Sequence, residues 1–210
     1  GGIVAAPTTS LPERLGGARN WDYRFCWVRD STFTLYALLL AGYRDEASAW
    51  RDWLLRSAAG RPEDLQTLYG VDGDRVRTEF EIPWLAGYAK SKPVRVGNAA
   101  SVQLQLDVYG ELIDALCLAR GAGLERDASE WRFEVTLLKF LERSWREPDH
   151  GIWETRGEKR HFTHSKVMAW VAFDRAIHDM EKYGLRGPLA RWRKLRARIP
   201  TRRFGKLEDL

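Results

Sequence analysis

Cysteine is scarce in this sequence: the only two among 210 residues are Cys26 and Cys117. Two cysteines are too few for a disulfide framework, and their spacing does not form a metal-binding pair. Both have apolar or aromatic neighbours, which predicts buried thiols in a reducing compartment and therefore a cytoplasmic protein. A continuous apolar run of about 18 residues is also missing, which excludes a membrane-spanning helix.

The sequence also lacks the features of a secretory signal. It begins Gly1-Gly2-Ile3 rather than with Met, and no basic region followed by a long apolar region comes after. We therefore expect the chain to be cut from something longer. Its 210 residues, 44% hydrophobic and 30% charged, suit one soluble domain or a large part of one.

The formal net charge of +5 is unevenly distributed. Residues 191–206 hold eight Lys or Arg and no acid, whereas the rest of the chain has 26 basic and 29 acidic residues. A nucleic-acid function would depend on this segment alone, and a solvated helix face with a frayed end explains the segment better. We expect neither nucleic acid nor a membrane as a partner.

Tryptophan is unusually abundant and occurs throughout the chain. A core can absorb only some of these side chains, so the surplus predicts a pocket lined by aromatic rings. The ten residues are Trp21, Trp27, Trp50, Trp53, Trp84, Trp131, Trp145, Trp153, Trp170 and Trp192.

Apolar spacing predicts an all-α fold of six helices. The first carries Phe33, Tyr36, Ala37 and Leu40 on one face; Asp45 is a candidate cap for the second, and Gly184 a stop for the fifth. Residues 1–19 and 60–97 lack this periodicity and are expected to be irregular. The expected helices cover residues 30–42, 45–59, 99–120, 128–146, 162–183 and 189–199. Three helical hairpins in series indicate a toroid of repeated helix pairs.

Residues 19–30, RNWDYRFCWVRD, combine four aromatic rings, three arginines and two aspartates. Sugars require such a surface, because their C–H faces rest on rings and their hydroxyls need directional hydrogen bonds. We interpret Trp27 as a platform, with Arg29 and Asp30 binding hydroxyls. The alternative is a solvated pair at a helix start, where Asp30 favours the helix dipole and Ser31 or Thr32 caps.

A second segment, residues 149–157 (DHGIWETRG), contains a candidate acid. A glycosidase protonates a poor leaving group, so it needs a carboxyl whose pKa is raised by apolar surroundings. Ile152 and Trp153 are suitable neighbours for Glu154. The alternative is that Glu154 pairs with Arg156 or Arg160 on a surface turn.

Several segments resemble the catalytic domain of bacterial and archaeal glucoamylase-like enzymes, glycoside hydrolase family 15. They occur in family order and cover about residues 1–198, which leaves residues 199–210 as a basic tail outside the family pattern. They are GGIVAAPTTSLPE (1–13), RNWDYR (19–24), WVRD (27–30), VRVGNAA (94–100), 103–110, 151–157 and 162–175. The resemblance implies an (α/α)6 barrel of two concentric rings, here about half of it, and exo-acting hydrolysis of α-glucosidic bonds with inversion.

The resemblance also implies roles for individual residues, with no metal or cofactor. Glu154 matches the general acid, and Arg29 and Asp30 match the pair that holds hydroxyls of the terminal glucose. Trp27 and Trp153 match pocket aromatics, and Asn98 and Gln103 belong to a substrate-binding motif near the pocket.

Inversion needs a second carboxylate to activate water, and no segment after Glu154 resembles the family's base motif. The acidic residues considered there are Glu158, Asp174, Asp179, Glu181, Glu208 and Asp209. We therefore expect a fragment of a hydrolase acting on α-1,4-glucan ends or trehalose, inactive alone and prone to self-association through exposed half-barrel faces. The alternatives are a non-catalytic helical sugar-binding module and a nucleic-acid binder that uses the basic tail.

Overall fold

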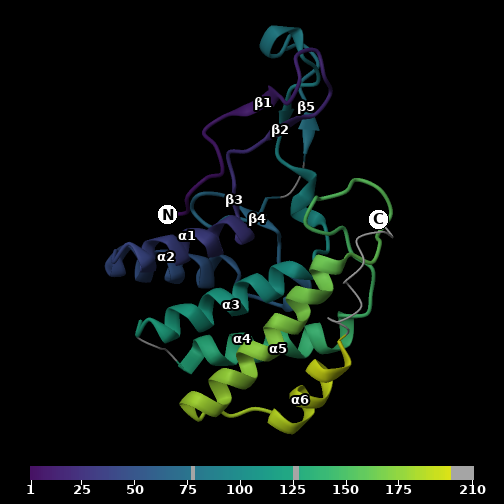
Figure 1. Cartoon of the computed structure of the whole chain (residues 1–210). Helices are drawn as coiled ribbons and strands as arrows, with labels where there is room; N and C mark the ends of the chain where they lie inside the picture. Colours follow the sequence, from purple (N-terminus) through teal and green to yellow (C-terminus); the bar gives the residue numbers. More distant parts are fainter. Residues whose placement is uncertain (77–78, 125–127, 200–210) are drawn as a thin grey trace.

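The structure, a computed structural model, describes residues 1–76, 79–124 and 128–199, and six α-helices are its main elements (Figure 1). The mostly helical prediction is confirmed, and the predicted ends of the fourth to sixth helices agree with the structure within about two residues. The helices are α1 Val28–Leu40, α2 Arg44–Ser57, α3 Asp107–Gly121, α4 Ala128–Ser144, α5 Thr163–Tyr183 and α6 Leu189–Arg198. Gly184 ends α5 in the left-handed conformation expected of a glycine stop.

Short strands and 3-10 helices fill the segments between the helices. The expectation that residues 1–19 are irregular was partly wrong, because β1 Thr9–Pro12 pairs with β2 Asn20–Asp22. Two further antiparallel pairs join β3 Cys26–Trp27 to β4 Leu68–Tyr69 and β5 Phe80–Glu81 to β6 Arg95–Val96. The 3-10 helices are η1 Pro62–Asp64, η2 Tyr88–Lys90 and η3 Ala99–Val102. The β1, β2 and β5 strands project from the helical body at the top of Figure 1.

The helix expected over residues 99–120 is split, and this split shapes the site. The side chain of Asn98 accepts a hydrogen bond from the amide of Ala100 and caps the short η3. The chain then leaves helical geometry until Asp107, and a buried carboxylate oxygen of Asp149 accepts from the Leu106 amide just before α3. Asp45 is likewise not a cap, because Tyr43 holds that position and Asp45 lies in the first turn of α2.

The core lies between α1, α3 and α5, with α3 in the middle of this row. The second helix of each hairpin packs against the first, α2 on α1, α4 on α3 and α6 on α5. A Cβ atom at Gly110 of α3 would overlap the backbone of Met168 on α5, so glycine allows this close helix contact. Fully buried side chains at the centre include Leu112, Ile113, Leu116, Phe173 and Trp192.

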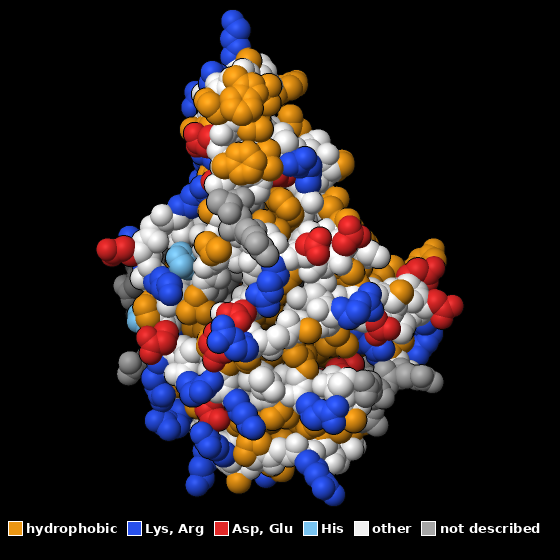
Figure 2. Space-filling model, turned by 180° about the vertical axis from the view of Figure 1, so that it is seen from behind, with side chains coloured by type: hydrophobic (Ala, Val, Ile, Leu, Met, Phe, Trp, Pro, Cys, Tyr) orange, Lys and Arg blue, Asp and Glu red, His pale blue; other side chains and the backbone are white. Residues whose placement is uncertain are grey.

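The apolar face predicted for the first helix is not in the core. Phe33 and Leu40 are 63% and 71% exposed, whereas Val28 and Leu35 of the same helix are buried. Hydrophobic side chains also gather at the upper end in Figure 2. Elsewhere in the chain, Trp84 and Tyr88 are 81% and 62% exposed. In the described ranges, none of the helices combines the length and apolarity that a membrane crossing requires.

The structure shows the surroundings of the two cysteines and of the basic residues of α6. Both cysteines are free and buried, as predicted. On α6, Arg191 pairs with Glu142, Arg193 with Glu181 and Arg196 with Asp174. Ion pairs of this kind are typical of a solvated helix face. Residues 200–210, the end of the basic tail, lie outside the described residues.

A buried ionic cluster joins α3, α4 and α5. Arg120 donates to carboxylates of Glu130, Glu134 and Asp179, and Arg51 lies 3.9 Å from Glu130. The cluster thus places three carboxylates against two guanidinium groups, and Glu134 is fully buried. Burial, reinforced by the neighbouring Glu130, raises the pKa of Glu134 to about 8 despite Arg120.

Because this pKa is raised in the folded state, stability is expected to fall as pH rises. The unfolded chain releases the Glu134 proton near its ordinary pKa, whereas the folded chain holds it up to about 8. Between these values the free energy of unfolding decreases by up to about 1.4 kcal/mol per pH unit from this group. Urea denaturation from pH 5 to 8 should show a shallower slope for Glu134→Gln, and an unchanged slope for the exposed control Glu46→Gln. Equal slopes for all three proteins would contradict the assignment.

Candidate active site

A cavity of about 950 Å³ opens where the strands meet the helices. The structure brings all seven predicted site residues to it. They are Trp27, Arg29, Asp30, Asn98, Gln103, Trp153 and Glu154. These residues come from the β3 to α1 junction, from the segment around η3, and from the turn between α4 and α5. One hollow therefore unites residues up to 127 positions apart in the sequence.

The closest contact in this cavity joins Trp27 to Glu154. Trp27 is fixed by pairing with Leu68 across β3 and β4, and the amide of Val28 donates to the carbonyl of Thr67. The indole Nε1 of Trp27 donates to Oε1 of Glu154 at 2.6 Å. Trp27 thus holds the predicted acid by its polar edge, in addition to offering a ring to the cavity.

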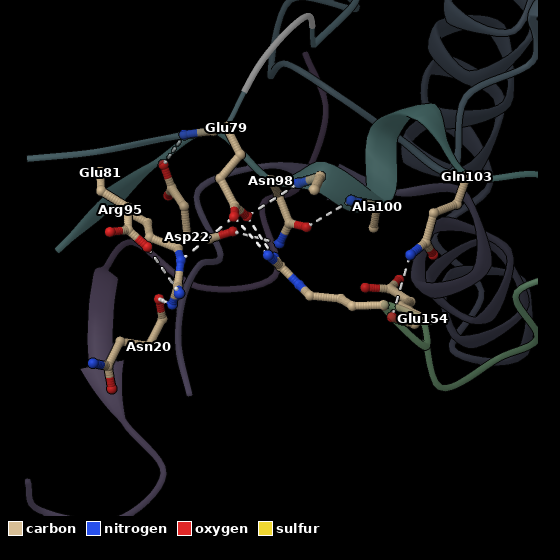
Figure 3. A network of polar contacts seen from close by, with 12 residues as sticks. Asn20, Asp22, Glu79, Glu81, Arg95, Asn98, Ala100, Gln103 and Glu154 are labelled. Atoms are coloured by element: carbon tan, nitrogen blue, oxygen red, sulfur yellow. Dashed lines mark hydrogen bonds and ion pairs between the residues drawn. The ribbon is translucent and has the colours of Figure 1, made fainter. Parts of the chain in front are cut away.

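The backbone at Glu154 is held in an unusual conformation. Its φ of +53° lies in the left-handed region, which residues other than glycine seldom adopt. The turn is stabilised from the η3 segment, because the side-chain Nε2 of Gln103 donates to the carbonyls of Glu154 and Thr155 at 3.3 and 3.2 Å (Figure 3). The side chain of Gln105 in turn donates to Gln103.

The surroundings of Glu154 favour its protonated form. Burial raises its pKa above the ordinary value for glutamate, and the negative charge of Asp30 adds to this effect. The hydrogen bond from Trp27 and the guanidinium of Arg29, 3.7 Å away, oppose it without reversing it. A carboxyl that keeps its proton to higher pH is suited to donate it to a leaving group.

One detail of the sequence interpretation was wrong, and the surface-turn alternative for Glu154 is not realised through Arg156. The surface pairing of Glu154 with Arg156 does not form, because Arg156 donates to both oxygens of Glu79 at 2.7 and 2.5 Å. Trp153 is 84% exposed and does not enclose Glu154, although it lines the same cavity. The indole that contacts Glu154 belongs to Trp27.

The alternative interpretation of Arg29 and Asp30, a solvated pair at the start of a helix, is only partly correct. They do lie in the first turn of α1, but Trp27 is the N-cap and no side chain caps the helix. The hydroxyl of Ser31 instead donates back to the carbonyl of Trp27. The Arg29 side chain is only 17% exposed, so it is a cavity residue and not a solvated partner of Asp30.

Sequence reasoning missed a polar wall of the cavity. Glu79 binds Arg156, Arg95 and the amide of Ala99 (Figure 3). Burial alone would raise the pKa of Glu79, but the hydrogen bonds from Arg156 and Ala99 hold it below its ordinary value. The guanidiniums of Arg156 and Arg95 both lie over the Trp21 ring, at centroid distances of 4.0 and 4.7 Å.

Asn98 connects this wall to the strands. Its side-chain amide donates to the carbonyl of Asp22 at 3.3 Å, and its oxygen accepts from Ala100. The fully buried carboxylate of Asp22 accepts from Gly97 and from Arg24. Asn98 is 4% exposed, so its described contacts are with the protein although it borders the cavity.

A second polar layer lies behind Arg29. Asp107 at the start of α3 is fully buried, with Oδ2 3.9 Å from Arg29 and 3.8 Å from His164. Burial raises the pKa of Asp107, and a hydrogen bond with Glu111 raises that of His164. Asp107 falls within the 103–110 motif, so the sequence drew attention to this residue but did not predict a role for it.

Three carboxylates line the cavity among the described residues: Glu13, Asp30 and Glu154. The acidic residues that follow Glu154 lie elsewhere. Asp174 and Glu181 pair with arginines of α6, Asp179 belongs to the Arg120 cluster, and Glu158 does not line the cavity. Glu208 and Asp209 lie outside the described residues.

These features agree with comparisons to known proteins. Residues 1–204 match the family described as Glycosyl hydrolases family 15, and the chain belongs to this family. This match places the chain in the class of glycoside hydrolases.

The chain is 41% identical to the trehalase of Mycolicibacterium smegmatis over 95% of this chain and 30% of that protein. It is 47% identical to trehalase 1 of Sulfolobus acidocaldarius, over 83% of this chain and 32% of that enzyme. The isomaltose glucohydrolase of Kribbella flavida is 31% identical over 77% of this chain and 39% of its own length. The chain therefore spans about a third of the length of these curated relatives. No solved structure gave a significant match.

Proposed function

We propose that this cavity is the sugar site of an inverting, exo-acting α-glucosidic hydrolase, and that Glu154 is its general acid. The observation that carries the proposal is the setting of Glu154, a partly buried carboxyl with a raised pKa beside Trp27 and Arg29. In the reaction, the Glu154 carboxyl transfers its proton to the glycosidic oxygen as the bond to the anomeric carbon breaks. Water then adds to that carbon from the opposite face.

The other cavity residues hold the sugar or the acid. Trp27 and the exposed Trp153 offer rings to the C–H faces of a glucose unit, and Arg29 and Asp30 bind its hydroxyls. Asn98 and Gln103 border the cavity, but their side chains form hydrogen bonds to the protein. We therefore propose that Asn98 and Gln103 act mainly by positioning the backbone at Asp22 and Glu154, and that they contact the substrate little.

We propose trehalose as the substrate, with α-1,4-glucan ends as the alternative. Six relatives at 39–47% identity carry the name trehalase, although each is matched over only part of its length. A cavity of about 950 Å³ is large enough for a disaccharide. A complete (α/α)6 barrel would place further helices beside the row formed by α1, α3 and α5.

The base is the missing element. An inverting site needs a carboxylate about 6.5–9.5 Å from the acid on the other side of the sugar. The described lining offers only Glu13 and Asp30 besides Glu154, and Asp30 belongs to the proposed hydroxyl-binding pair. We therefore expect the 210-residue chain alone to bind sugar with negligible turnover, which also keeps a non-catalytic sugar-binding module as the second candidate.

Sugar binding is tested by titrating trehalose, maltose and acarbose against tryptophan fluorescence. Trp27→Ala is expected to weaken binding by about tenfold or more, because it removes a ring and the hydrogen bond to Glu154. Trp84→Ala is the control, since Trp84 is 81% exposed and lies outside the cavity lining. Binding that is unchanged in Trp27→Ala would place the sugar elsewhere. Turnover at the rate of a complete trehalase would contradict the proposal that this chain lacks the base.

Self-association is expected through the exposed apolar face of α1. Phe33, Tyr36 and Leu40 are 63%, 45% and 71% exposed, and large exposed apolar patches drive association. Sedimentation velocity should show concentration-dependent association that Phe33→Ser with Leu40→Ser reduces. A monomer at all concentrations, or no effect of these changes, would count against this surface.

A further inference from the structure

Three metal-ligating side chains meet between α3 and α5, away from the sugar cavity. Cys117 lies on α3, and His178 and Asp179 are consecutive residues of α5. Their ligand atoms all lie within 4.8 Å of one another, and the structure describes no other such group of three. The bland interpretation is a hydrogen-bonded trio in which the thiol and the imidazole both contact Asp179.

The donor atoms are spaced much as they are in a tetrahedral zinc site. Bonds of about 2.3 Å to sulfur and about 2.0–2.1 Å to nitrogen and oxygen, at tetrahedral angles, separate S from N by about 3.6 Å, S from O by about 3.5 Å and N from O by about 3.3 Å. The observed separations are 3.8 Å from Cys117 Sγ to His178 Nδ1, 3.3 Å from Cys117 Sγ to Asp179 Oδ1, and 3.0 Å from His178 Nδ1 to Asp179 Oδ1. Each is within about 0.3 Å of the required value. We propose that Cys117, His178 and Asp179 bind a zinc ion in a tetrahedral site with an open fourth position.

Asp179 is already oriented as a metal ligand would be. Its Oδ2 accepts from Arg120, which leaves Oδ1 toward Cys117 and His178. Carboxylates that bind metals are commonly fixed by such an outer hydrogen bond. The thiol releases its proton to solvent when a sulfur–zinc bond forms, so the ion and thiolate together add one positive charge. The Asp179 carboxylate, which would bind the ion directly, offsets that charge.

An ion has a route to the site. Cys117 and His178 both line a hollow of about 430 Å³, whose other walls include Tyr36, Leu39 and Leu118. The His178 side chain is 49% exposed. The hollow can admit a water molecule or another small donor as the fourth ligand.

The test uses the full 210-residue chain, stripped of metal with a chelator and titrated with Co²⁺, then with Zn²⁺ in competition. A cobalt ion bound to one thiolate in tetrahedral geometry gives a sulfur-to-metal absorption band and intense visible bands. One equivalent of Co²⁺ should produce these bands, and one equivalent of Zn²⁺ should abolish them. His178→Gln and Cys117→Ser should each weaken binding by more than the about 10–100-fold that losing an outer partner costs.

Cys26→Ser is the matched control, because it removes the other buried thiol and should leave the titration unchanged. His178→Gln alters a half-exposed side chain, so it reports on the site even if Cys117→Ser does not fold. The proposal is overturned if cobalt gives no sulfur band, if His178→Gln binds as tightly as the original chain, or if the band disappears only with Cys26→Ser.

Discussion

Glu154→Gln is expected to lower kcat for trehalose by about 10²–10⁴ in a chain whose sugar site is complete, the range that a general acid contributes. Such a chain can be made by joining residues 1–198 to the part of the Sulfolobus acidocaldarius trehalase 1 that follows its matched segment, because the two are 47% identical over 179 residues. Glutamine keeps an oxygen for the Trp27 hydrogen bond but has no carboxyl proton to give. Initial rates on trehalose, with KM determined separately, provide the measurement.

The control for this prediction is Glu158→Gln, which removes a carboxylate four positions further along the same turn. Glu158 is outside the cavity lining, so its variant should keep the rate of the parent chimera. An active chimera that is unaffected by Glu154→Gln would refute the acid role. The joined part of trehalase 1 is expected to supply the base. A chimera that binds trehalose but does not hydrolyse it would therefore favour the sugar-binding module.

Arg120→Met is expected to lower the free energy of unfolding by about 3–5 kcal/mol, the cost of leaving buried charges without their partner. Arg120 is 5% exposed and is the guanidinium to which Glu130, Glu134 and Asp179 all bind. Methionine has a similar length, so the loss reports charge rather than a cavity. Urea denaturation at pH 7, with the slope checked for two-state behaviour, provides the measurement.

Two further variants separate charge from packing. Adding Glu130→Gln to Arg120→Met should recover part of the loss, because it removes a carboxylate that Arg120 no longer neutralises. Arg193→Met removes a half-exposed partner of Glu181 and should cost less than about 1 kcal/mol. If Arg120→Met costs no more than Arg193→Met, the cluster does not contribute to stability as described.

The helices of the second half of the chain follow closely from local pattern. The fourth to sixth were expected near residues 128–146, 162–183 and 189–199, and the structure has Ala128–Ser144, Thr163–Tyr183 and Leu189–Arg198. Their signals are local, because apolar side chains at helical spacing and a glycine stop act within a few residues. The segment 99–120 did not follow its pattern, since Asn98 and Asp149 bind backbone amides and interrupt the helix.

The candidate site was found through motifs and not through contacts. The segments around Trp27, Arg29 and Glu154 marked their residues as a sugar site, and the structure places them around one cavity. No local feature favoured Trp27 over Trp153 as the ring that contacts Glu154. Adjacency along the chain suggested Trp153, whereas the turn directs that side chain to solvent.

The sequence by itself determined the helical class, most helix ends and the membership of a hydrolase family. It also singled out the carboxyl at position 154 as the candidate acid. Only the tertiary structure decided that Phe33 and Leu40 face outward, that Arg156 binds Glu79, and that Cys117 meets His178 and Asp179. The reason is physical. Helix formation depends on neighbours within about four residues, whereas burial and side-chain contact depend on which distant surfaces pack together, and no local pattern records that.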